Sequence, residues 1–412
     1  MSNHGGGRKQ CSIWLHYEQT FIPDRMKPPL LSMLLVSLGS MGHLSSGAVF
    51  PWPSPGLSSL DVHNQTLTGH EITLTPTEKD MTGSMVSAGS LLGAWGAGYV
   101  VTTIGRRRSL QVVVVPFVIG WLMNALAPHV NVLLSARFIL GIACGGTSVA
   151  ASTYVMELSD TNVRGMMSTI PTFGIVLGGL YTVALGYLVH WHYLALLCLV
   201  PVAMLMAATF VLPDSPSLLI IKGRKERAKI ILQGLRGPYA DVDAEVKELE
   251  QRNIGSSKKS GYRSLLTGDT GRRLGVVLSL FFFQQFCGNY VFMIYTSRVL
   301  KNAGSSLDPD AATIIVAVVR VIGTVVAIVL MDRVGRRVCL ISSHALNAMV
   351  LILLGVFVYL EEAAGNDDSN FQSLSWVPLM CVILEMFAVN MGAHCVPYTL
   401  ATEYFPTSIR AQ

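Results

Sequence analysis

Several side chains that could bind a polar solute lie inside long apolar runs of this sequence. Gln284 and Gln285 are neighbours in one run, while Arg320 and Glu385 each lie nine residues into later runs. A carboxamide both donates and accepts hydrogen bonds, and an arginine within a membrane usually faces a cavity and has a partner. We therefore predict that one of the glutamines contacts a substrate and that Arg320 pairs with Glu385. The alternatives are a hydrogen bond between helices for a glutamine and an outward reach to the membrane surface for Glu385.

Charged residues recur at the ends of the runs with the same spacing in each half of the chain. Gly-Arg-Arg follows the second run at 105–107 and the eighth run at 335–337, and a Glu seven positions before an Arg follows both the fourth and the tenth. Simple anchoring by positive charge explains one Gly-Arg-Arg but not the repeated spacing. Arginine and carboxylate at helix ends can latch two parts of a protein when partly desolvated and release them when hydrated. We predict such a latch from Arg106, Arg107, Glu157 and Arg164 in the first half and from Asp332, Arg333, Arg336, Arg337, Glu403 and Arg410 in the second.

Ten apolar runs must position these groups. Of the 412 residues, 51% are hydrophobic and 13% are charged, against roughly 25% charged in soluble domains. About 20 apolar residues cross the ~30 Å hydrocarbon core as a helix, because lipid offers the backbone no hydrogen-bond partner. The predicted spans are Leu30–Phe50, Thr82–Thr102, Leu110–Pro128, Val132–Ser152, Met166–Val189, Tyr193–Leu212, Leu274–Ser297, Ala311–Met331, Val338–Leu360 and Trp376–Leu400.

The basic residues predict an orientation. With the N-terminus in the cytoplasm, most of the 30 Lys and Arg residues fall on the inner side, where short loops of membrane proteins concentrate positive charge. The net charge of +5 then reflects topology, and we predict no nucleic acid partner. The loop Pro51–Met81 lies outside and holds an Asn-x-Thr sequon at Asn64, which we predict to be glycosylated. The cysteines lie mostly inside spans and do not form a disulfide framework.

The repeated signatures divide the chain into halves. Residues 1–29 are predicted to be a cytoplasmic segment, 30–212 a bundle of six spans, 213–273 a cytoplasmic helical linker and 274–412 a bundle of four spans. In the linker, 224–235 and 241–252 are predicted helices, the second with Val242, Val246 and Leu249 on one face. A parallel repeat of six-span halves around a site at mid-depth is a recognised transporter plan. The sequence therefore shows ten of the usual twelve spans, and we interpret it as a fragment or a truncated product.

Several motifs, taken together and in order, carry a resemblance to a known family. They are Pro213-Asp214-Ser215-Pro216 with Lys222-Gly223-Arg224, Gln284-Gln285-Phe286-Cys287-Gly288, Asp332-Arg333-Val334-Gly335-Arg336-Arg337, Pro397-Tyr398 and Glu403-Tyr404-Phe405-Pro406. With these motifs the sequence resembles the sugar porters of the major facilitator superfamily, especially the insect facilitated trehalose transporters and hexose carriers. The resemblance implies an all-α membrane protein with the major facilitator fold, built from two pseudo-symmetric helical bundles.

The resemblance also implies a function. It indicates facilitative transport of trehalose or a hexose across the plasma membrane by alternating access, with no enzymatic activity and no cofactor or metal. It places substrate binding at Gln284, Gln285, Tyr290, Arg320, Asn390, Tyr398 and Thr172. Some of these depart from the family pattern: Thr172 stands in place of a Gln, and Tyr290 and Arg320 each in place of an Asn. These departures leave the identity of the sugar open.

The first span decides between coupled and downhill transport. Proton-coupled sugar carriers of this family hold an acid there, whereas Leu30–Phe50 contains only His43 as a titratable group, which we interpret as a packed polar residue. Downhill diffusion is therefore favoured, unless Glu385 is unpaired and faces a cavity. Two alternatives stay open, a sugar sensor that does not transport and a truncated product that regulates a full-length partner. Uptake activity separates a carrier from both. The predicted partners are the sugar and the lipid bilayer, and the sequence gives no oligomeric state.

Overall fold

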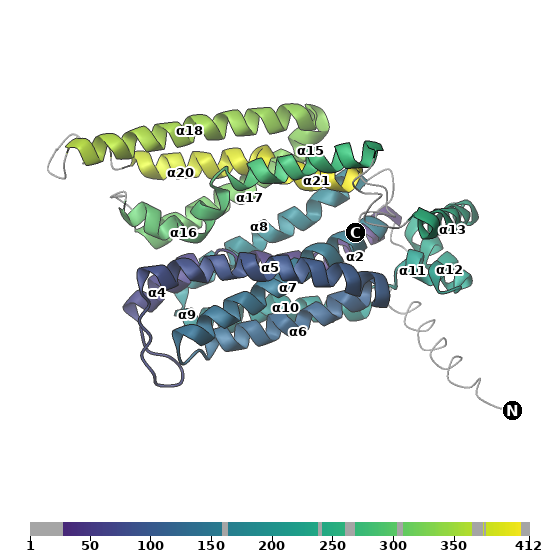
Figure 1. Ribbon diagram of the computed structural model, residues 1–412, viewed down its shortest axis with the longest axis horizontal. Coiled ribbons are helices and arrows are strands. Elements are labelled where there is room, and N and C mark those ends of the chain that lie inside the picture. Colours follow the sequence, from purple (N-terminus) through teal and green to yellow (C-terminus); the bar gives the residue numbers. More distant parts are fainter. Residues whose placement is uncertain are drawn as a thin grey trace.

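The computed structural model describes residues 28–158, 164–237, 241–259, 268–302, 308–364, 374 and 376–404. Within these ranges every regular element is a helix, apart from one isolated antiparallel bridge between Gln65 and Glu71. Figure 1 shows two groups of long helices lying side by side, with a group of short helices beyond one end. The all-helical fold predicted from the sequence is confirmed.

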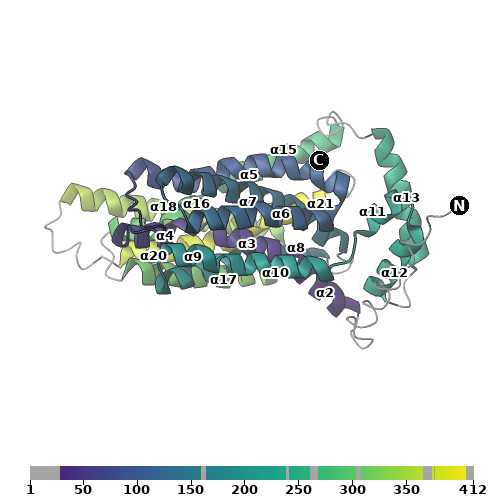
Figure 2. The same ribbon diagram turned by 90° about the horizontal axis from the view of Figure 1, so that it is seen from below.

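The helices follow the chain in three groups. The first half contains α2 (Pro28–Gly39), α3 (Met41–Val49), α4 (Pro53–Val62), α5 (Pro76–Ile104), α6 (Arg106–Ala125), α7 (Val130–Leu158), α8 (Arg164–Leu188), α9 (Trp191–Leu197) and α10 (Leu199–Val211). The linker helices are α11 (Pro216–Ile221), α12 (Lys225–Arg236) and α13 (Val242–Lys259). The second half contains α15 (Gly268–Gln285), α16 (Asn289–Asn302), α17 (Pro309–Arg333), α18 (Arg336–Ala364), α20 (Val377–Ala388), the π-helical segment η1 (Val389–Ala393) and α21 (Cys395–Tyr404). We call the end of the bundles next to α11–α13 the linker end, and the opposite end, where α4 lies, the distal end (Figure 2).

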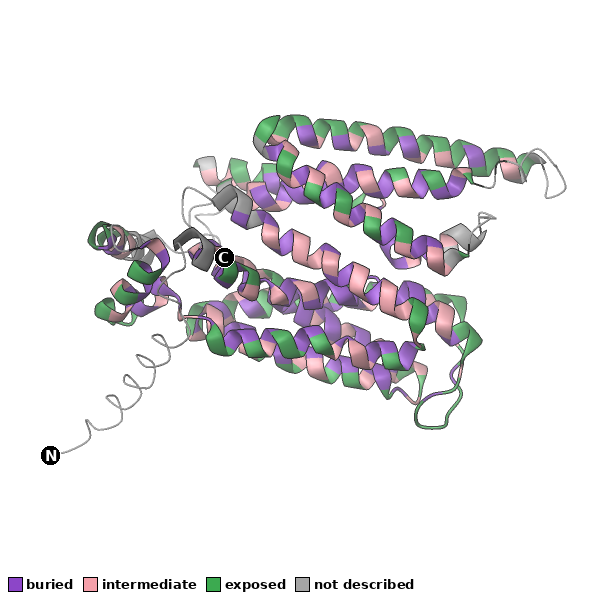
Figure 3. Cartoon of the chain, turned by 180° about the vertical axis from the view of Figure 1, so that it is seen from behind, coloured by how far each residue is buried: buried purple, intermediate pink, exposed green. Residues whose placement is uncertain are grey.

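The long helices carry an outward surface suited to lipid. Within the described residues, eight helical stretches are long and apolar enough to cross a membrane, and the bent run from α2 to α4 makes a ninth. The remaining predicted span lies in α5, whose 29 residues extend about 43 Å at 1.5 Å per residue. Figure 3 shows exposed residues along the outer helices of both groups. Large apolar side chains are among the exposed residues, such as Trp95 on α5 at 79% and Tyr359 on α18 at 71%. Many large exposed apolar side chains on long apolar helices indicate a membrane around the bundles.

Four predicted spans are not single straight helices. The first is divided into α2 and α3, and the chain then bends by 40° into α4. Pro51 and Pro53 lie at this bend, where a proline removes a backbone donor. The sixth span is divided into α9 and α10, the seventh breaks between α15 and α16, and the tenth contains η1. Four runs were expected to be continuous, and the structure corrects this: Leu30–Phe50, Tyr193–Leu212, Leu274–Ser297 and Trp376–Leu400.

Glycines allow α5 and α7 to approach each other closely. A Cβ atom added at Gly89 or Gly93 of α5 would lie 2.1 Å from a backbone oxygen of α7. One added at Gly141 or Gly145 of α7 would lie 2.2 or 2.0 Å from a backbone oxygen of α5. Small residues four apart are a usual means of close helix packing within membranes. This contact fixes the segments of α5 and α7 that face the second half.

The linker helices pack against the first half. Val242 and Val246 of α13 are each 4% exposed and share a core with residues of α12 and of the first half. The apolar face predicted for 241–252 is therefore confirmed. Ion pairs also join α12 to α13, with nitrogen–oxygen distances of 2.7 Å for Lys225–Glu250, 2.6 Å for Lys229–Asp243 and 3.0 Å for Arg236–Glu245.

Candidate functional site

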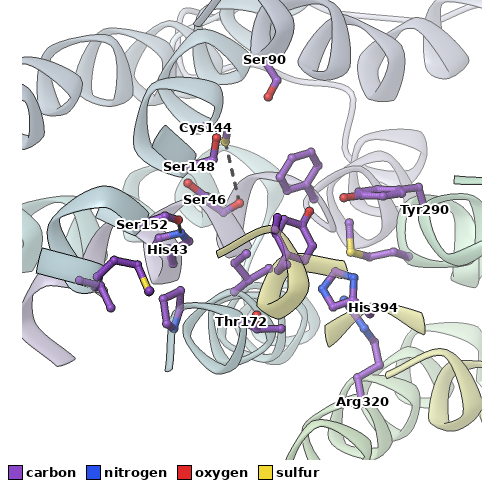
Figure 4. A pocket seen from close by; sticks show the side chains of 18 residues that line it. His43, Ser46, Ser90, Cys144, Ser148, Ser152, Thr172, Tyr290, Arg320 and His394 are labelled. Carbon is purple, nitrogen blue, oxygen red and sulfur yellow. Dashed lines mark hydrogen bonds between the residues drawn. The ribbon is translucent and has the colours of Figure 1, made fainter. Parts of the chain in front are cut away.

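A cavity of about 350 Å³ lies between the two halves (Figure 4). The first half contributes the polar side chains of His43, Ser46, Ser90, Ser148, Ser152 and Thr172. The second half contributes those of Tyr290, Arg320, His394 and Tyr398. A volume of this size is within the range of about 300–1,000 Å³ that is usual for small-molecule sites. Because hydroxyl groups both donate and accept, the wall can satisfy a solute that carries many polar groups.

Hydrogen bonds between the halves close the distal end. The carboxylate of Asp310, at the start of α17, accepts from Ser58 of α4 at 3.0 Å and from Ser297 of α16 at 2.8 Å. The backbone amide of Ser297 donates to the hydroxyl of Ser54 in α4 at 3.3 Å. The hydroxyl of Tyr295 donates to a carbonyl oxygen near the start of α5 at 3.1 Å. These contacts join α4 and α5 to α16 and α17.

The cavity extends the other way, toward the linker end. Val155 and Met156 of α7 and Ala401 of α21 line it. Each lies within three residues of the end of its helix, because α7 ends at Leu158 and α21 ends at Tyr404. The cavity is therefore one-sided, bounded by contacts between the halves at the distal end and continued toward the linker end.

A break between α15 and α16 brings a helix N-terminus to the cavity. Gly288 has a φ of 82°, a conformation that glycine adopts without strain, and α16 begins at the next residue. Asn347 of α18 donates from Nδ2 to the carbonyl oxygen of Cys287 at 3.1 Å. This carbonyl oxygen therefore has a hydrogen-bond partner at the break. Tyr290, in the first turn of α16, lines the cavity.

The segment η1 directs α21 toward the cavity. The hydroxyl of Ser343 in α18 donates to the carbonyl oxygen of Ala388 at 2.6 Å and accepts from the amide of Ala393 at 2.8 Å. A side chain inserted into a helical ladder is a usual cause of such a bulge. A Cβ atom at Gly392 would lie 2.4 Å from a carbonyl oxygen of α18, so this approach requires glycine. His394 and Tyr398 follow directly and both line the cavity.

Four of the seven substrate-binding residues predicted from the sequence lie together at this cavity. They are Thr172, Tyr290, Arg320 and Tyr398. They come from α8, α16, α17 and α21, so the cavity is built from both halves of the chain. Their binding of a substrate stays a prediction.

The other three predicted residues are not among those that line the cavity. Gln284 is fully buried and donates from Nε2 to the carbonyl oxygen of His394 at 3.2 Å. This bond fits the alternative of a link between helices. Gln285 is exposed. Asn390 is fully buried and donates to the carbonyl oxygen of Met386 at 2.7 Å. Contact of these three side chains with a substrate is a prediction that the geometry does not by itself support.

Several lining residues were missed from the sequence. Cys144, Ser148 and Ser152 lie four residues apart along α7, and all three line the cavity. Their spacing in the sequence could have identified them, because residues four apart share one face of a helix. His43, interpreted as a packed residue, is 4% exposed and also lines the cavity, with Nε2 3.3 Å from the hydroxyl oxygen of Ser152. His394 carried no sequence signal, since η1 determines its direction.

Arg320 and Glu385 are both buried, with exposed fractions of 4% and 1%. The two described side chains form no ion pair within 4.0 Å, and neither carboxylate oxygen of Glu385 has a hydrogen-bond partner. The predicted pair is therefore not a direct ion pair, although the two buried charges interact electrostatically, and the alternative that Glu385 reaches outward is wrong. Equal depth along two helices does not fix the direction in which a side chain points, and Arg320 points into the cavity wall instead.

Three of the four first-half residues of the predicted latch form ion pairs at the linker end: Arg106, Arg107 and Glu157. Nη2 of Arg106 lies 2.8 Å from a carboxylate oxygen of Glu157, which also accepts a hydrogen bond from Ser215. Nη1 of Arg107 lies 3.5 Å from a carboxylate oxygen of Asp214. These ion pairs join the ends of α6 and α7 to the motif that precedes α11. They stabilise the linker end of the first half.

The second-half part of the latch is described only in part. Arg333 and Arg337 are exposed and Arg336 is half-buried. The side chains of Arg164, Asp332 and Glu403, and all of Arg410, lie outside the described residues. A latch between the two halves stays a prediction.

Two features lie away from the cavity. Asn64 is partly exposed in the distal segment between α4 and α5, where its carbonyl oxygen accepts from the amide of Ile72 at 2.9 Å. Its glycosylation stays a prediction. In the part of the chain that the structure describes, no group of three or more His, Cys, Asp or Glu side chains is arranged to hold a metal ion.

Sequence and structure comparisons place the chain in a family. The family "Sugar (and other) transporter" matches residues 59–412. A "Facilitated trehalose transporter Tret1" from Drosophila willistoni is 32% identical over 96% of this chain and 44% of its own length. One from Polypedilum vanderplanki is 30% identical over 96% of this chain and 77% of its own length. The chain thus spans less than half the length of the Drosophila relatives that it matches.

Solved structures support the same placement. The proton:xylose symporter XylE bound to 6-bromo-6-deoxy-D-glucose has a TM-score of 0.74 and 26% identity, over 92% of this chain and 83% of that one. A partially occluded inward-open conformation of XylE from E. coli has a TM-score of 0.73 and 22% identity, over 92% and 86% of the two chains. From its helices, its cavity between two halves and these similarities, the chain belongs to the Sugar (and other) transporter family and has the major facilitator fold.

Proposed function

We propose that this chain carries a sugar across a membrane by alternating access, without coupling to protons. The observation that carries the proposal is the one-sided cavity, which both halves line with hydroxyl and imidazole groups. A sugar that loses its water needs every hydroxyl group satisfied, since an unpaired buried polar group costs about 1–3 kcal/mol. No Asp or Glu is among the described residues that line the cavity, which favours downhill transport. The names of the relatives support trehalose or a hexose as the first substrates to test.

We further propose that the carrier works in the plasma membrane with its linker end in the cytoplasm. The positive charge on that side supports this orientation. Asn64 then lies outside the cell, where a glycan can be attached. In this orientation the cavity extends toward the cytoplasm, and the hydrogen bonds of Asp310 close the outer side.

Counterflow uptake of labelled trehalose, glucose and xylose into proteoliposomes that contain the 412-residue chain tests the proposal. Ser148 is exposed to the cavity, so Ser148→Phe should fill it and abolish uptake. Val115→Phe is the matched control, because Val115 is 56% exposed on the outward face of α6. We expect saturable uptake that a proton uncoupler leaves unchanged and that only the Ser148 variant loses.

The sensor alternative gives a different result. A sugar sensor binds the sugar, seen as a rise in melting temperature that Ser148→Phe abolishes, but gives no counterflow. A chain that neither binds nor transports any of these sugars contradicts the proposal.

A further inference from the structure

Arg320 gives the cavity a fixed charge. Of the described residues that line the cavity, it is the only Lys, Arg, Asp or Glu. Its side chain is 4% exposed and comes from the middle of α17. A charge enclosed by membrane-spanning helices is poorly screened and acts strongly on any solute beside it. The cavity therefore favours a solute with negative charge.

The guanidinium of Arg320 has no acceptor from the protein. In the part of the chain that the structure describes, it makes no hydrogen bond, and its buried Nε atom has no partner. The charge of the buried Glu385 carboxylate acts on Arg320 electrostatically, but the two side chains form no ion pair within 4.0 Å, so Glu385 supplies no hydrogen-bond acceptor. A buried guanidinium without an acceptor is costly, so the fold leaves donors unused at the cavity wall. Figure 4 shows Arg320 reaching from α17 toward His394.

The guanidinium also reaches the opposite half. A Cβ atom at Gly179 of α8 would lie 3.6 Å from Nη1 of Arg320. The donors of Arg320 therefore lie where the two halves meet, which is the place where an alternating-access carrier holds its substrate. A carboxylate bound there would lie between the halves.

A helix N-terminus adds to the positive character of the wall. Tyr290, in the first turn of the 14-residue α16, lines the same cavity as Arg320. The N-terminus of a helix carries a partial positive charge and free amide donors, and half-helices in transporters commonly direct it at anionic groups. Arg320 and the start of α16 thus favour the same sign of charge.

The rest of the wall suits a sugar rather than a simple anion. Ser148, Ser152, Thr172 and Tyr398 present hydroxyl groups to the same cavity. We propose that the preferred substrate is a sugar acid, whose carboxylate is bound by the guanidinium of Arg320 and whose hydroxyl groups are bound by these side chains. The proposal rests on the proposed transport function and names the substrate class of the same site. Arginine recognises carboxylate through two parallel hydrogen bonds, which a neutral sugar cannot match.

Uptake of D-glucuronate and D-glucose into proteoliposomes tests this assignment. The two sugars differ only at C6, where glucuronate carries a carboxylate in place of the hydroxymethyl group of glucose. We expect the unaltered chain to prefer glucuronate by about tenfold or more, as a charge-assisted pair allows. Since an anion carries charge, its uptake should rise when the vesicle interior is made positive, whereas glucose uptake should not respond. Arg320→Asn should lose the preference, whereas any glucuronate that it still carries should keep the response to potential, because the charge that crosses the membrane is that of the solute. Arg320→Lys, which keeps the positive charge but not the two parallel donors of the guanidinium, should retain part of the preference.

Lys247→Gln is the matched control, since it removes an exposed positive charge on the linker helix α13. It should leave the preference unchanged. Size-exclusion profiles show whether each variant is folded. If Arg320→Asn does not fold, the preference of the unaltered chain for glucuronate over glucose still tests the proposal.

The outcomes separate the two proposals. Glucose uptake that equals or exceeds glucuronate uptake in the unaltered chain overturns the sugar-acid assignment and leaves sugar transport standing. Equal preference in Arg320→Asn and the unaltered chain overturns the role of Arg320. Absence of uptake of every sugar tested contradicts the transport function itself.

Discussion

Among the described residues, two arginines are buried within the membrane-spanning helices, and their hydrogen bonding differs. Arg137 of α7 is fully buried and donates from Nε to the carbonyl oxygen of Thr82 at 3.1 Å and from Nη2 to that of Val49 at 2.8 Å. Its guanidinium lies 5.3 Å from the ring centroid of Trp52. Arg320 is buried to almost the same degree and has no such acceptor in the described part of the chain.

The difference indicates that the buried arginines of the two halves have different roles. Arg137 joins α7 to α3 and α5, and a cation over an aromatic face is itself stabilised. Arg320 brings an equivalent charge to the cavity and keeps it available. Burial alone therefore does not identify a functional arginine. The distinguishing feature is whether the protein supplies acceptors: two of the three side-chain nitrogens of Arg137 donate to backbone carbonyls and its Nη1 has no partner, whereas the guanidinium of Arg320 has no acceptor in the described part of the chain.

The largest effect on stability should come from Arg137→Gln. The substitution removes the donors to two buried carbonyl oxygens, each of which costs about 1–3 kcal/mol when unsatisfied, so we expect a loss of roughly 2–6 kcal/mol. Thermal unfolding of the detergent-solubilised chain measures it. Retention of the melting temperature of the unaltered chain would contradict the structural role of Arg137.

Ser343→Ala should have the next largest effect. The hydroxyl group of Ser343 bridges the carbonyl of Ala388 and the amide of Ala393 at η1, so its loss removes a partner from each, at a cost of up to about 1–3 kcal/mol per group. Because η1 directs His394 and Tyr398, we also expect a raised KM for uptake. Ser342→Ala is the control, since the hydroxyl group of Ser342 donates only to a carbonyl of its own helix at 3.2 Å. Equal effects of the two substitutions would refute this account of η1.

Asp310→Ala tests the contact that holds the distal end closed. Loss of the hydrogen bonds from Ser58 and Ser297 should shift the population toward opening there, and we expect roughly tenfold faster alkylation of a Ser54→Cys reporter, as loss of a bond to a charged group predicts. Asp308→Ala removes a neighbouring carboxylate that caps α17 by accepting from the amide of Ala311 at 3.2 Å. This control should leave the reporter rate unchanged, and an equal rise in both variants would count against the proposed closure.

Arg320→Gln should change stability little. The substitution removes no hydrogen bond that the described structure contains, and it removes a buried charge without an acceptor, so we expect an unchanged or slightly raised melting temperature. The same thermal scan as for Arg137→Gln gives the comparison directly. A loss as large as that of Arg137→Gln would show that Arg320 is structural.

The smallest effect should come from Asp243→Asn in the linker. The hydrogen bond from Lys229 lowers the pKa of the exposed Asp243 carboxyl group. Its contribution is therefore present above the usual aspartate pKa and is lost as the pH falls through the lowered value. Because the pair is exposed, we expect no detectable change in melting temperature at pH 7. A clear drop in melting temperature would mean that exposed ion pairs outside the membrane contribute as much to stability as buried charges inside it.

Sequence periodicity predicted the parts of this protein that depend on local composition. The apolar runs and the face of Val242 and Val246 follow from residue types along one helix, and the pair of Arg106 with Glu157 follows from charged residues at the ends of two helices, α6 and α7. The breaks do not. The opening of η1 depends on Ser343, and the break before α16 is stabilised by Asn347, each from a helix distant in the sequence.

The sequence also misplaced some site residues, because tertiary packing determines the direction in which a side chain points. Neighbouring residues on a helix point about 100° apart, so Gln284 and Gln285 could not both face one cavity, and the sequence did not show that neither of them lines it. Equal depth similarly said nothing of the direction in which Arg320 and Glu385 point. The stripe of Cys144, Ser148 and Ser152 was visible and would have identified the first-half wall.

Access to the cavity tests the central claim most directly. A thiol at Ser148→Cys, in a chain with Cys144→Ser, can be treated in sealed vesicles with a membrane-impermeant alkylating reagent from either side. The account predicts reaction mainly from the side of the linker helices, slowed by a transported sugar. Reaction mainly from the distal side, or a rate that no transported sugar alters, would contradict it.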